Sequence, residues 1–424
     1  MWFDDCVMYQ IYPIGFCGAE PKNNGETAHR FDIVENQIPH IRSLGIDCVM
    51  FNPVVKSGSH GYDTIDFKNV DNRLGDNAEF KRLIDSFHSS GIKVIYDAVF
   101  NHVGRDFPQF KDVCVNKRNS VYKDWFYIDF NGNSPYNDGF CYKDWDGCAE
   151  LVKLNLENDE VQRHLFDAVG YWIDYYGIDG LRLDVARLLP SWFFEKLRKF
   201  ASSKKKDFPL IGEVVRIHEH VQNVTDDRLT SVTDYECYSG MISSVNQPNF
   251  FEIAHSIERN FARGGLFYGK NLLNFVDNHD VRRVATAIRD PRNLKVVYAL
   301  MFALPGVPCI YYGSEFAAKG DNSNGDAPLR PAFAEIDKSD ERLICTVRKL
   351  SEIRKNNGDA VTGEYGKVYL NNAVFAMRRG SLLYAFNVTD ATAEIDACGR
   401  KINVPSHGYI VDKDGETLAI EGDR

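Results

Sequence analysis

Short apolar runs alternate with longer amphipathic stretches along most of the chain. Short runs of this kind indicate strands buried on both faces, and apolar residues spaced three and four apart indicate helices. Strand–helix alternation predicts βα units and a parallel sheet. The expected strands are 7–12, 48–51, 93–99, 180–183, 210–212, 231–235, 274–276 and 309–312, and the expected helices are 33–44, 77–90, 161–175, 192–201, 251–262, 294–304 and 340–355.

The alternation breaks in two places. Between residues 103 and 150 the chain is rich in Asp, Asn, Gly and aromatic residues, and its apolar period is weak. That stretch is too long for a plain loop, so we interpret it as an inserted domain. From about residue 357 the apolar segments become short and alternating, separated by Gly, Asn and Asp, which indicates a small antiparallel β domain.

Four of the expected strands end in charged clusters. These are the segments 94–102 (VIYDAVFNH), 180–184 (GLRLD), 210–213 (LIGE) and 273–280 (LNFVDNHD). A buried strand should not end in charge unless its end opens on a polar cleft, and parallel barrels place such a cleft at the C-terminal ends of their strands. The sequence therefore predicts an α/β fold. It comprises a (β/α)8 TIM barrel (1–102 and 151–356), an inserted domain (103–150) and a C-terminal antiparallel β domain (357–424).

Composition and charge argue against some classes of function. The chain has 424 residues, a net charge of −10 and no basic stripe, which argues against a nucleic-acid partner. No apolar run approaches ~18 residues, so we expect no membrane span. The ten cysteines form no CxxC pair, and the start lacks the pattern of a signal peptide, so we expect a reducing cytoplasm. The 13% aromatic content suits sugar stacking, although core packing accounts for most of it.

The strand-end carboxylates point to glycoside hydrolysis. Asp184, Glu213 and Asp280 follow apolar strands closely, and a retaining glycosidase needs an ionised nucleophile beside a protonated acid. Arg182 shares a strand face with Asp184 and should keep its pKa low. Glu213 has no cation within two residues, so we expect a raised pKa there. The alternative is that these carboxylates cap helices or form surface ion pairs. That alternative can explain a single charged strand end, but it does not explain four such ends that follow one another in the order of a barrel.

These segments resemble the four signatures of the α-amylase family of glycoside hydrolases, in order and spacing. The matching residues are Asp97–His102, Gly180–Asp184, Gly212–Val214 and Phe275–Asp280. The resemblance implies that Asp184 is the nucleophile, Glu213 the acid/base and Asp280 the stabiliser of the transition state. It also implies that Arg182, His102 and His279 hydrogen-bond the sugar at the cleavage point.

The resemblance extends to the flanking segments. His60-Gly61-Tyr62-Asp63 is similar to a family segment whose Tyr stacks on that same sugar, which assigns Tyr62. Asp326 and Arg330 resemble the pair that grips the next sugar on the non-reducing side. The insertion matches the family's B domain, and the tail matches its C-terminal domain. The chemistry requires no cofactor. Many relatives bind structural Ca²⁺, for which Asn101 is the candidate ligand here.

The chain departs from its relatives on the leaving-group side. Residues 151–155 (LVKLN) resemble the marker of the neopullulanase and cyclomaltodextrinase branch, with Val152 in place of Pro. Arg187 and Leu188 stand where that branch carries Asn-Glu and where typical α-amylases carry Lys-His. Val215 replaces an aromatic residue, and the dimerising N-terminal domain of the branch is missing. These positions leave the preferred glucan, and the oligomeric state, undefined.

Three functions remain in competition. The first is a retaining hydrolase that cleaves α-1,4 bonds of maltooligosaccharides, cyclodextrins or starch-derived glucans. The second is a transglycosylase or sugar phosphorylase that uses the same covalent intermediate. The third is a non-catalytic amylase-like protein that binds glucans. The complete set of three carboxylates favours an enzyme.

Overall fold

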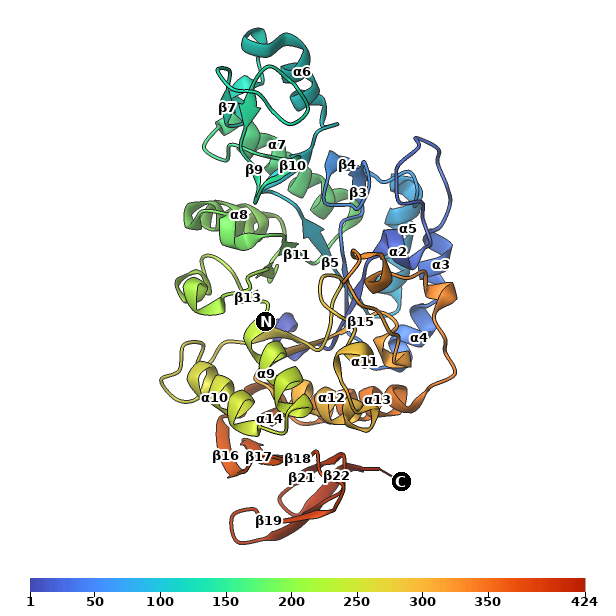
Figure 1. The fold of residues 1–424 in the computed structure, drawn as a ribbon, viewed down its shortest axis with the longest axis vertical. Helices are drawn as coiled ribbons and strands as arrows, with labels where there is room; N and C mark the ends of the chain where they lie inside the picture. The colour runs from blue at the N-terminus through green and yellow to red at the C-terminus, as the bar shows by residue number, and fades with distance from the viewer. Residues whose placement is uncertain (424) are drawn as a thin grey trace.

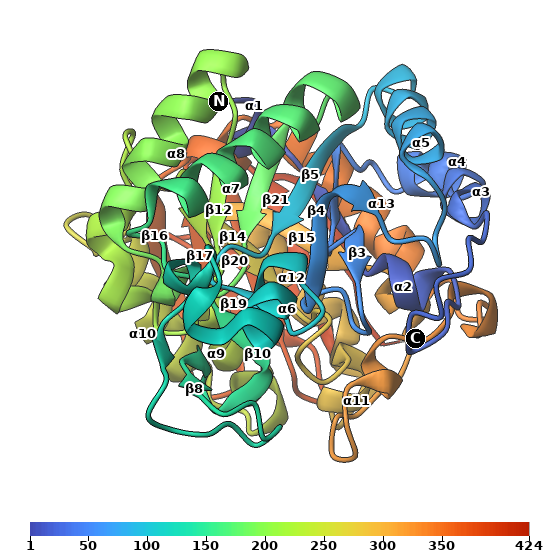
Figure 2. The ribbon, with the colours of Figure 1, turned by 90° about the horizontal axis from the view of Figure 1, so that it is seen from above.

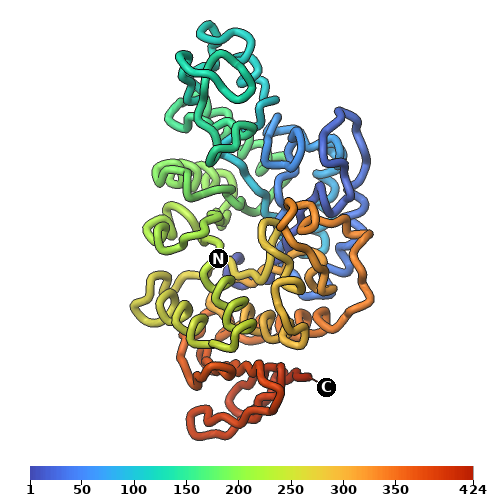
Figure 3. Tube along the Cα trace, in the orientation of Figure 1, coloured from blue at the N-terminus to red at the C-terminus, as the bar shows by residue number. Residues whose placement is uncertain are grey.

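The computed structural model describes residues 1–423 as three parts stacked along the longest axis (Figure 1). A barrel with its helices forms the middle, the inserted segment stands at one end, and the C-terminal strands form a separate layer at the other. The same division is visible along the Cα trace (Figure 3). The N-terminus lies in the middle part, and the C-terminus lies beside β22.

The middle part is an eight-stranded parallel barrel, as predicted. Its strand order is β13-β12-β11-β5-β2-β1-β15-β14, and a parallel bridge from Thr233 to Leu273 joins the two edges. Figure 2 shows the strands at the centre with helices around them. The barrel strands are β1 (Met8–Ile11), β2 (Cys48–Phe51), β5 (Lys93–Ala98), β11 (Gly180–Leu183), β12 (Leu210–Gly212), β13 (Ser231–Val232), β14 (Leu272–Phe275) and β15 (Gly306–Tyr311).

Amphipathic helices surround the barrel and bury their apolar faces against it. In α5, Phe80, Leu83, Ile84 and Phe87 are buried, and the Asp76 side chain caps the first turn by accepting from the Glu79 amide at 2.8 Å. The helices are α1 (Trp2–Asp5), α2 (Pro13–Phe16), α3 (Phe31–Glu35), α4 (Ile38–Ser43), α5 (Asn77–Ser89), α7 (Asp159–Tyr171), α8 (Ser191–Lys204), α9 (Tyr235–Asn246), α10 (Phe250–Phe261), α11 (Val284–Ala287), α12 (Leu294–Ala303), α13 (Arg342–Asn356) and α14 (Asp359–Thr362).

The structure corrects two of the predicted helices and adds one that was not predicted. The helix expected at 33–44 is two short helices, α3 and α4, because Pro39 begins a new helix at its N-terminal end. The helix expected at 161–175 ends as α7 and continues into a π-helical turn, Trp172–Tyr176. Helix α9 was not predicted, because its small and polar residues give a weak apolar period and its start overlaps the strand expected at 231–235.

The inserted segment is held to the barrel by an antiparallel sheet. Strand β6 (His102–Gly104) pairs with β10 (Cys148–Lys153), which pairs with β9 (Asp144–Trp145). A helix, α6 (Pro108–Asn116), and the hairpin of β7 (Ile128–Asp129) and β8 (Cys141–Tyr142) complete it. Nearby, β3 (Val55–Ser57) pairs with β4 (Thr64–Val70). Strand β6 begins only four residues after the end of barrel strand β5, so its pairing with β10 places the inserted sheet next to the strand ends of the barrel.

The C-terminal strands form an antiparallel sheet of order β16-β17-β18-β21-β22, with a separate β19–β20 pair. Buried Arg354 of α13 connects distant parts of the chain by donating to the carbonyls of Asp4, Cys6, Gly306 and Ala360. The strands are β16 (Tyr365–Leu370), β17 (Val374–Arg379), β18 (Leu382–Asn387), β19 (Ala393–Asp396), β20 (Lys401–Val404), β21 (Gly408–Lys413) and β22 (Glu416–Glu421).

Two expectations about the whole chain can be compared with the structure. Within residues 1–423, no helix is both long and apolar enough to span a membrane. All ten cysteines are free thiols. Cys6, Cys48 and Cys309 belong to one buried apolar cluster in the barrel. The predicted domain boundaries remain predictions.

Candidate active site

One buried arginine joins three carboxylates at the C-terminal ends of neighbouring barrel strands. Nη1 of Arg182, in β11, donates to both oxygens of Asp97 at 2.8 Å and to Oδ1 of Asp184 at 2.9 Å. Its Nη2 lies 2.8 Å from Oε1 of Glu213. Parallel pairing places these residues side by side, because the Asp184 amide donates to Ala98 and the Glu213 amide donates to Leu183. The structure thus brings together Arg182, Asp184 and Glu213.

The shared arginine changes the electrostatics that the sequence predicted. One guanidinium faces three carboxylates, so the fully ionised cluster has a net charge of −2. Burial raises the pKa of Asp97 to about 6, and burial together with the negative charges of Glu213 and Asp97 raises the pKa of Asp184 despite the pull of Arg182. The predicted low pKa of Asp184 was therefore wrong. Glu213, which has no cation within two residues in the sequence, contacts the same arginine.

A strained residue fixes Glu213 from the other side. Val185 follows Asp184 directly and has a φ of 45°, in the left-handed region that β-branched residues avoid. In this conformation its backbone N–H donates to Oε2 of Glu213 at 2.9 Å. Such a backbone costs on the order of 1–3 kcal/mol and is found mainly at functional sites. The two Glu213 oxygens are thus held by two different groups, both supplied by the strand end that carries Asp184.

Tyr62 and His279 form the opposite wall of the cluster. The two rings stack with centroids 5.6 Å apart, and the Tyr62 hydroxyl contacts Nε2 of His279 and donates to Oδ2 of Asp97 at 3.1 Å. Burial and the neighbouring Arg330 and Arg182 lower the pKa of His279, which keeps its imidazole neutral. The Gln10 amide donates to its Nδ1 at 3.0 Å, so its proton lies on Nε2.

Asp280 lies between His279 and a second arginine. Its Oδ2 is 3.0 Å from Nε2 of His279, and its Oδ1 accepts from Nη2 of Arg330 at 2.9 Å. The same Nη2 donates to Asp326 at 3.0 Å, and the guanidinium lies 4.8 Å from the ring centroid of Tyr12. Asp280 is more exposed than Asp184, with 38% of its side chain accessible. The predicted pair Asp326 and Arg330 therefore adjoins Asp280 directly.

His102 lies at the base of the inserted domain, in β6. Burial lowers its pKa to about 3, so the imidazole is neutral, and its buried Nε2 has no hydrogen-bond partner. Its Nδ1 contacts the amide nitrogen of Asn101 at 3.1 Å, and the ring of Trp145 lies 5.9 Å away. A buried nitrogen without a partner beside the strand ends is suited to bind a sugar hydroxyl.

The calcium prediction depends on Asn101. Its Oδ1 is buried without a partner, as a free metal ligand would be. However, no group of three or more His, Cys, Asp or Glu within residues 1–423 is arranged to hold a metal ion. Calcium takes about six to eight oxygen ligands, with carboxylates prominent among them. Structural calcium at Asn101 therefore stays a prediction, and no step of the chemistry is assigned to a metal.

Sequence reasoning missed four residues of the site. Asp97 binds Arg182 with both oxygens, Asn52 donates to Asp97 at 3.1 Å and to Tyr62 at 3.0 Å, and Gln10 donates to Asn52 at 2.9 Å. Each is a buried polar residue at the end of an apolar barrel strand, the same signal that identified Asp184. The fourth, Tyr12, follows β1 and stacks on His279 with a centroid distance of 6.1 Å.

The residues that depart from the family lie beyond the cluster. Arg187, in the short 3-10 helix Ala186–Leu188, forms an ion pair with Asp146 of the inserted domain. Val215 is 57% exposed just after Glu213. Leu188 is also partly accessible in the same loop region. None of these side chains contacts the carboxylate cluster in an ion pair or hydrogen bond, so they define the surroundings of the site rather than its centre.

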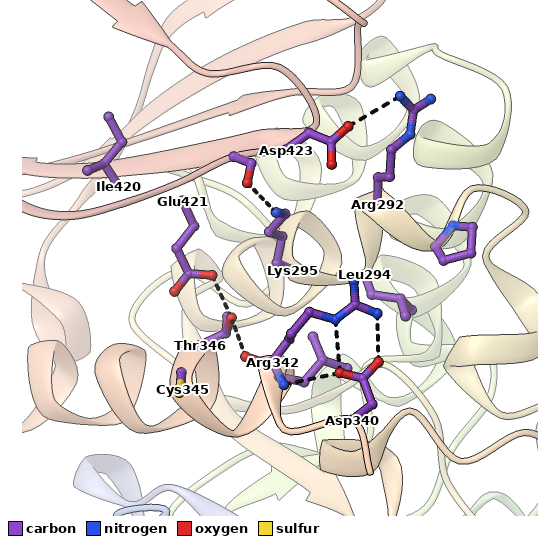
Figure 4. Close-up of a pocket in the computed structure, with 13 residues that line it drawn as sticks. Arg292, Leu294, Lys295, Asp340, Arg342, Cys345, Thr346, Ile420, Glu421 and Asp423 are labelled. Atoms are coloured by element: carbon purple, nitrogen blue, oxygen red, sulfur yellow. Dashed lines mark hydrogen bonds and ion pairs between the residues drawn. The ribbon is translucent and has the colours of Figure 1, made fainter.

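A separate cavity lies away from the strand ends of the barrel. It measures about 690 Å³ and lies between α12, α13 and β22, on the side facing the C-terminal sheet (Figure 4). Its charged groups are satisfied within it: Arg342 pairs with Asp340 at 2.7 Å, Thr346 donates to Glu421 at 2.6 Å, and Lys295 donates to the Gly422 carbonyl at 2.6 Å. With its groups already paired, this cavity contains no arrangement suited to the chemistry of the strand ends.

A parallel barrel with paired carboxylates, a shared arginine and a tyrosine–histidine wall at its strand ends defines the class of glycoside hydrolases. The family model described as "Alpha amylase, catalytic domain" matches residues 10–344. The chain therefore belongs to the α-amylase family of glycoside hydrolases.

Named relatives are similar over most of the chain. The intracellular maltogenic amylase of Bacillus subtilis is 29% identical over 97% of this chain and 73% of its own length. A cyclomaltodextrinase from a Bacillus species is 32% identical over 76% of this chain and 61% of its own length. Among solved structures, the cyclic α-maltosyl-(1→6)-maltose hydrolase of Arthrobacter globiformis, in complex with that sugar, superposes with a TM-score of 0.84 at 25% identity, covering 97% of this chain and 98% of its own.

Proposed function

We propose that this enzyme hydrolyses α-1,4 bonds of maltooligosaccharides or cyclodextrins with retention of configuration. The observation that carries the proposal is the contact of Asp184 and Glu213 with different nitrogens of one guanidinium, at 2.9 and 2.8 Å. This contact supports the short separation that retaining glycosidases require, ~5–5.5 Å between carboxyl groups. The relatives named cyclomaltodextrinase and maltogenic amylase support the substrate class.

The proposed mechanism assigns one task to each carboxylate. Glu213 gives its proton to the glycosidic oxygen while the Asp184 carboxylate attacks the anomeric carbon, and the bond to the leaving sugar breaks. Glu213 then removes a proton from water, the water oxygen attacks the same carbon, and the bond to Asp184 breaks. Asp280 stabilises the positive charge that develops on the sugar ring in both steps. A substrate that excludes water from the cluster strengthens each of these interactions.

The neighbouring residues are proposed to bind the sugar at the cleavage point. Tyr62 offers its ring for stacking, and His102 offers the unpartnered Nε2 to a hydroxyl. The neutral His279 holds Asp280 through Nε2 at 3.0 Å. Asp326 and Arg330, which adjoin Asp280, are proposed to bind the next sugar on the non-reducing side. Arg182 is a positioning residue for all three carboxylates of the cluster.

We also propose that the enzyme works in the cytoplasm. Ten free thiols, several of them buried in the barrel, suit a reducing compartment. The printed name of the Bacillus subtilis relative, an intracellular maltogenic amylase, supports the same location. Fractionation of the cells that make the protein, followed by immunodetection, tests this: recovery from the medium or the cell envelope contradicts it.

The function is tested by initial rates on maltotriose, β-cyclodextrin, pullulan and starch, with the anomer of the first product read by NMR. We expect hydrolysis with an α-anomeric product, and loss of turnover in Asp184→Asn but not in the control Asp124→Asn, an exposed carboxylate of the inserted domain. A β-anomeric product, or an unaffected Asp184→Asn, refutes the mechanism. Products longer than the substrate indicate transglycosylation, and glucose 1-phosphate formed in phosphate buffer indicates a phosphorylase.

A further inference from the structure

Three cations lie on the inserted-domain side of the cluster. Lys153 is the register partner of His102 in the β6–β10 pair, so both side chains stand on the same face of the sheet. Lys143 precedes β9, and its carbonyl accepts from the Lys153 amide at 3.0 Å. Arg187 follows Asp184 by three residues in the loop after β11. We call Lys143, Lys153 and Arg187 the cation cluster.

Two of the three cations in the cluster, Lys143 and Lys153, have no ion-pair partner among the described residues. Within residues 1–423, neither Lys143 nor Lys153 has a carboxylate within 4.0 Å, and Asp146 is the partner of Arg187 alone. Lys143 lies over the ring of Tyr127 instead, 4.6 Å from its centroid. Burial lowers the pKa of Lys153, and the positive charges of Lys143 and Arg187 lower it further while Asp146 opposes them. Three cations gathered around a single carboxylate, Asp146, disfavour the free protein unless a further anion binds.

A neutral donor faces the same space. The Trp145 ring lies 5.9 Å from the His102 ring, and its buried Nε1 has no hydrogen-bond partner. Trp145 is in β9, two residues after Lys143 and therefore on the same face of the strand, and it directly precedes the Asp146 that pairs with Arg187. An indole N–H can only donate, so an acceptor is required to satisfy it. The cluster therefore combines excess positive charge with an unsatisfied donor, which together suit an oxygen-rich anion.

The topology places this cluster on the leaving-group side. In the strand order of the barrel, β11 and β15 are separated by three strands in either direction, so the loops that follow them lie on opposite sides of the axis. Arg187 follows β11, whereas Asp326 and Arg330, proposed above for the non-reducing side, follow β15. A substrate that lies across the cluster of Asp184 and Glu213 therefore directs its leaving sugar toward the cation cluster.

We propose that the cation cluster binds a phosphate ester on the leaving-group sugar, so that the enzyme prefers oligosaccharides whose reducing-end glucose is phosphorylated. This rests on the proposed function, because it assumes that the carboxylate cluster cleaves α-glucosidic bonds. Arg187 can exchange Asp146 for the phosphate, since this ion pair is 40% and 52% exposed and such pairs contribute little stability. Lysines and arginine are the usual partners of phosphate groups, through charge-assisted hydrogen bonds.

The first test compares glucose 6-phosphate with glucose as inhibitors of maltotriose hydrolysis. We expect an inhibition constant about tenfold lower for glucose 6-phosphate, which corresponds to one charge-assisted contact. In Lys153→Met and Lys143→Met the ratio of the two constants should approach one, and in Lys153→Arg the wild-type ratio should be retained. The control is Lys123→Met, a lysine of the inserted domain whose side chain is 41% exposed, and its ratio should not change. Equal constants in the wild type overturn the proposal.

The second test uses two isomers of phosphorylated maltose. We expect a higher kcat/KM than for maltose when the phosphate is on the reducing-end glucose, and no gain when it is on the other glucose. The reverse preference overturns the assignment to the leaving-group side. Inorganic phosphate is the third arm: inhibition as strong as that by glucose 6-phosphate, or formation of glucose 1-phosphate, overturns the assignment to a phosphorylated sugar and indicates a site for free phosphate.

A binding measurement separates this inference from the proposed function. Glucose 6-phosphate and glucose are titrated into the full chain by calorimetry, with no turnover required. If maltotriose is cleaved but glucose 6-phosphate binds no tighter than glucose, the cation-cluster inference fails alone. If no α-glucan is cleaved, the proposed function fails, and the inference fails with it even where glucose 6-phosphate binds.

Discussion

The substitution Asp184→Asn is expected to stabilise the fold while it abolishes hydrolysis. In the native site three carboxylates share one guanidinium, and Arg182, Asp97 and Asp184 are buried. The variant removes one negative charge and reduces the excess from −2 to −1. Its amide oxygen can still accept from Arg182, because only Oδ1 of Asp184 takes part in that hydrogen bond. Removal of an uncompensated buried charge generally raises stability at neutral pH.

The size of the effect follows from the raised pKa values in the cluster. For Asp97 the rise from 3.8 to about 6 corresponds to about 3 kcal/mol, since one pKa unit is worth ~1.4 kcal/mol. A carboxyl with a raised native pKa favours the folded state fully below about pH 4, and this contribution is lost as pH rises through about 6. The pKa of Asp184 is raised in the same direction. We therefore expect Asp184→Asn to be more stable than the wild type by about 1–3 kcal/mol at pH 7, with a much smaller gain at pH 4.

The assay is urea unfolding of the wild type, Asp184→Asn and the exposed control Asp124→Asn at pH 4, 5, 6 and 7. For a chain of this length the expected gain at pH 7 corresponds to a rise in Tm of about 1–3 °C. Turnover of maltotriose should fall by ~10⁴-fold or more in Asp184→Asn, as expected for the loss of a nucleophile. A variant that is less stable than the wild type at pH 7, or a stability difference that does not change between pH 4 and 7, refutes the reasoning about the shared arginine.

Four further predictions concern other parts of the molecule. Arg354→Met should lower the unfolding free energy by about 3–5 kcal/mol in urea, because four carbonyls lose their buried donor, whereas the exposed Arg348→Met should cost under about 1 kcal/mol. Asp179→Asn should lower the unfolding free energy by about 2–4 kcal/mol at pH 7 and by progressively less below pH 4. The partners of Asp179 lower its pKa, so its contribution to stability is present above its unfolded pKa and is lost as pH falls. An equal loss of stability at pH 3 would contradict this. Tyr62→Phe should reduce kcat/KM for maltotriose ~10–100-fold, because Asp97 and His279 lose a hydroxyl partner; a change under threefold would exclude that role. Chelation by EDTA should leave Tm and turnover unchanged, since no acidic cluster surrounds Asn101, and a fall in Tm restored by Ca²⁺ would show that a metal site exists.

The barrel could be predicted from the sequence because its strands carry a local signal. Each is a short apolar run, and all eight predicted runs overlap the observed strands. Helix α9 carries no comparable signal, because its small and polar residues pack through Cys237, Gly240 and Ser244 rather than through a broad apolar stripe. The break at Pro39 is visible in the sequence, but the apolar spacing on both sides of it suggested one continuous helix.

The residues of the site could be predicted wherever the end of a strand could be predicted, because most of them follow an apolar run directly. Polar residues after apolar runs include nearly every group now found around Arg182, and Asn52 and Gln10 show the same pattern although they were not selected. The sequence of one strand does not show which side chains from neighbouring strands contact its residues. Arg182 is two residues from Asp184 in sequence, yet it also binds Asp97 from β5 and Glu213 from β12. The predicted low pKa of Asp184 failed for that reason.

This sharing has a consequence for how the site divides acid from base. Asp184 and Glu213 contact one guanidinium at nearly the same distance, so that arginine cannot make one of them the acid and the other the nucleophile. The difference lies in their other contacts. Both oxygens of Glu213 are held, one by Arg182 and one by the Val185 amide, whereas Oδ2 of Asp184 is left without such a partner and is available to attack. The second Glu213 oxygen is held by Val185, whose φ of 45° lies in the left-handed region. The backbone immediately after the nucleophile therefore orients Glu213 beside an Asp184 that keeps one oxygen without a partner.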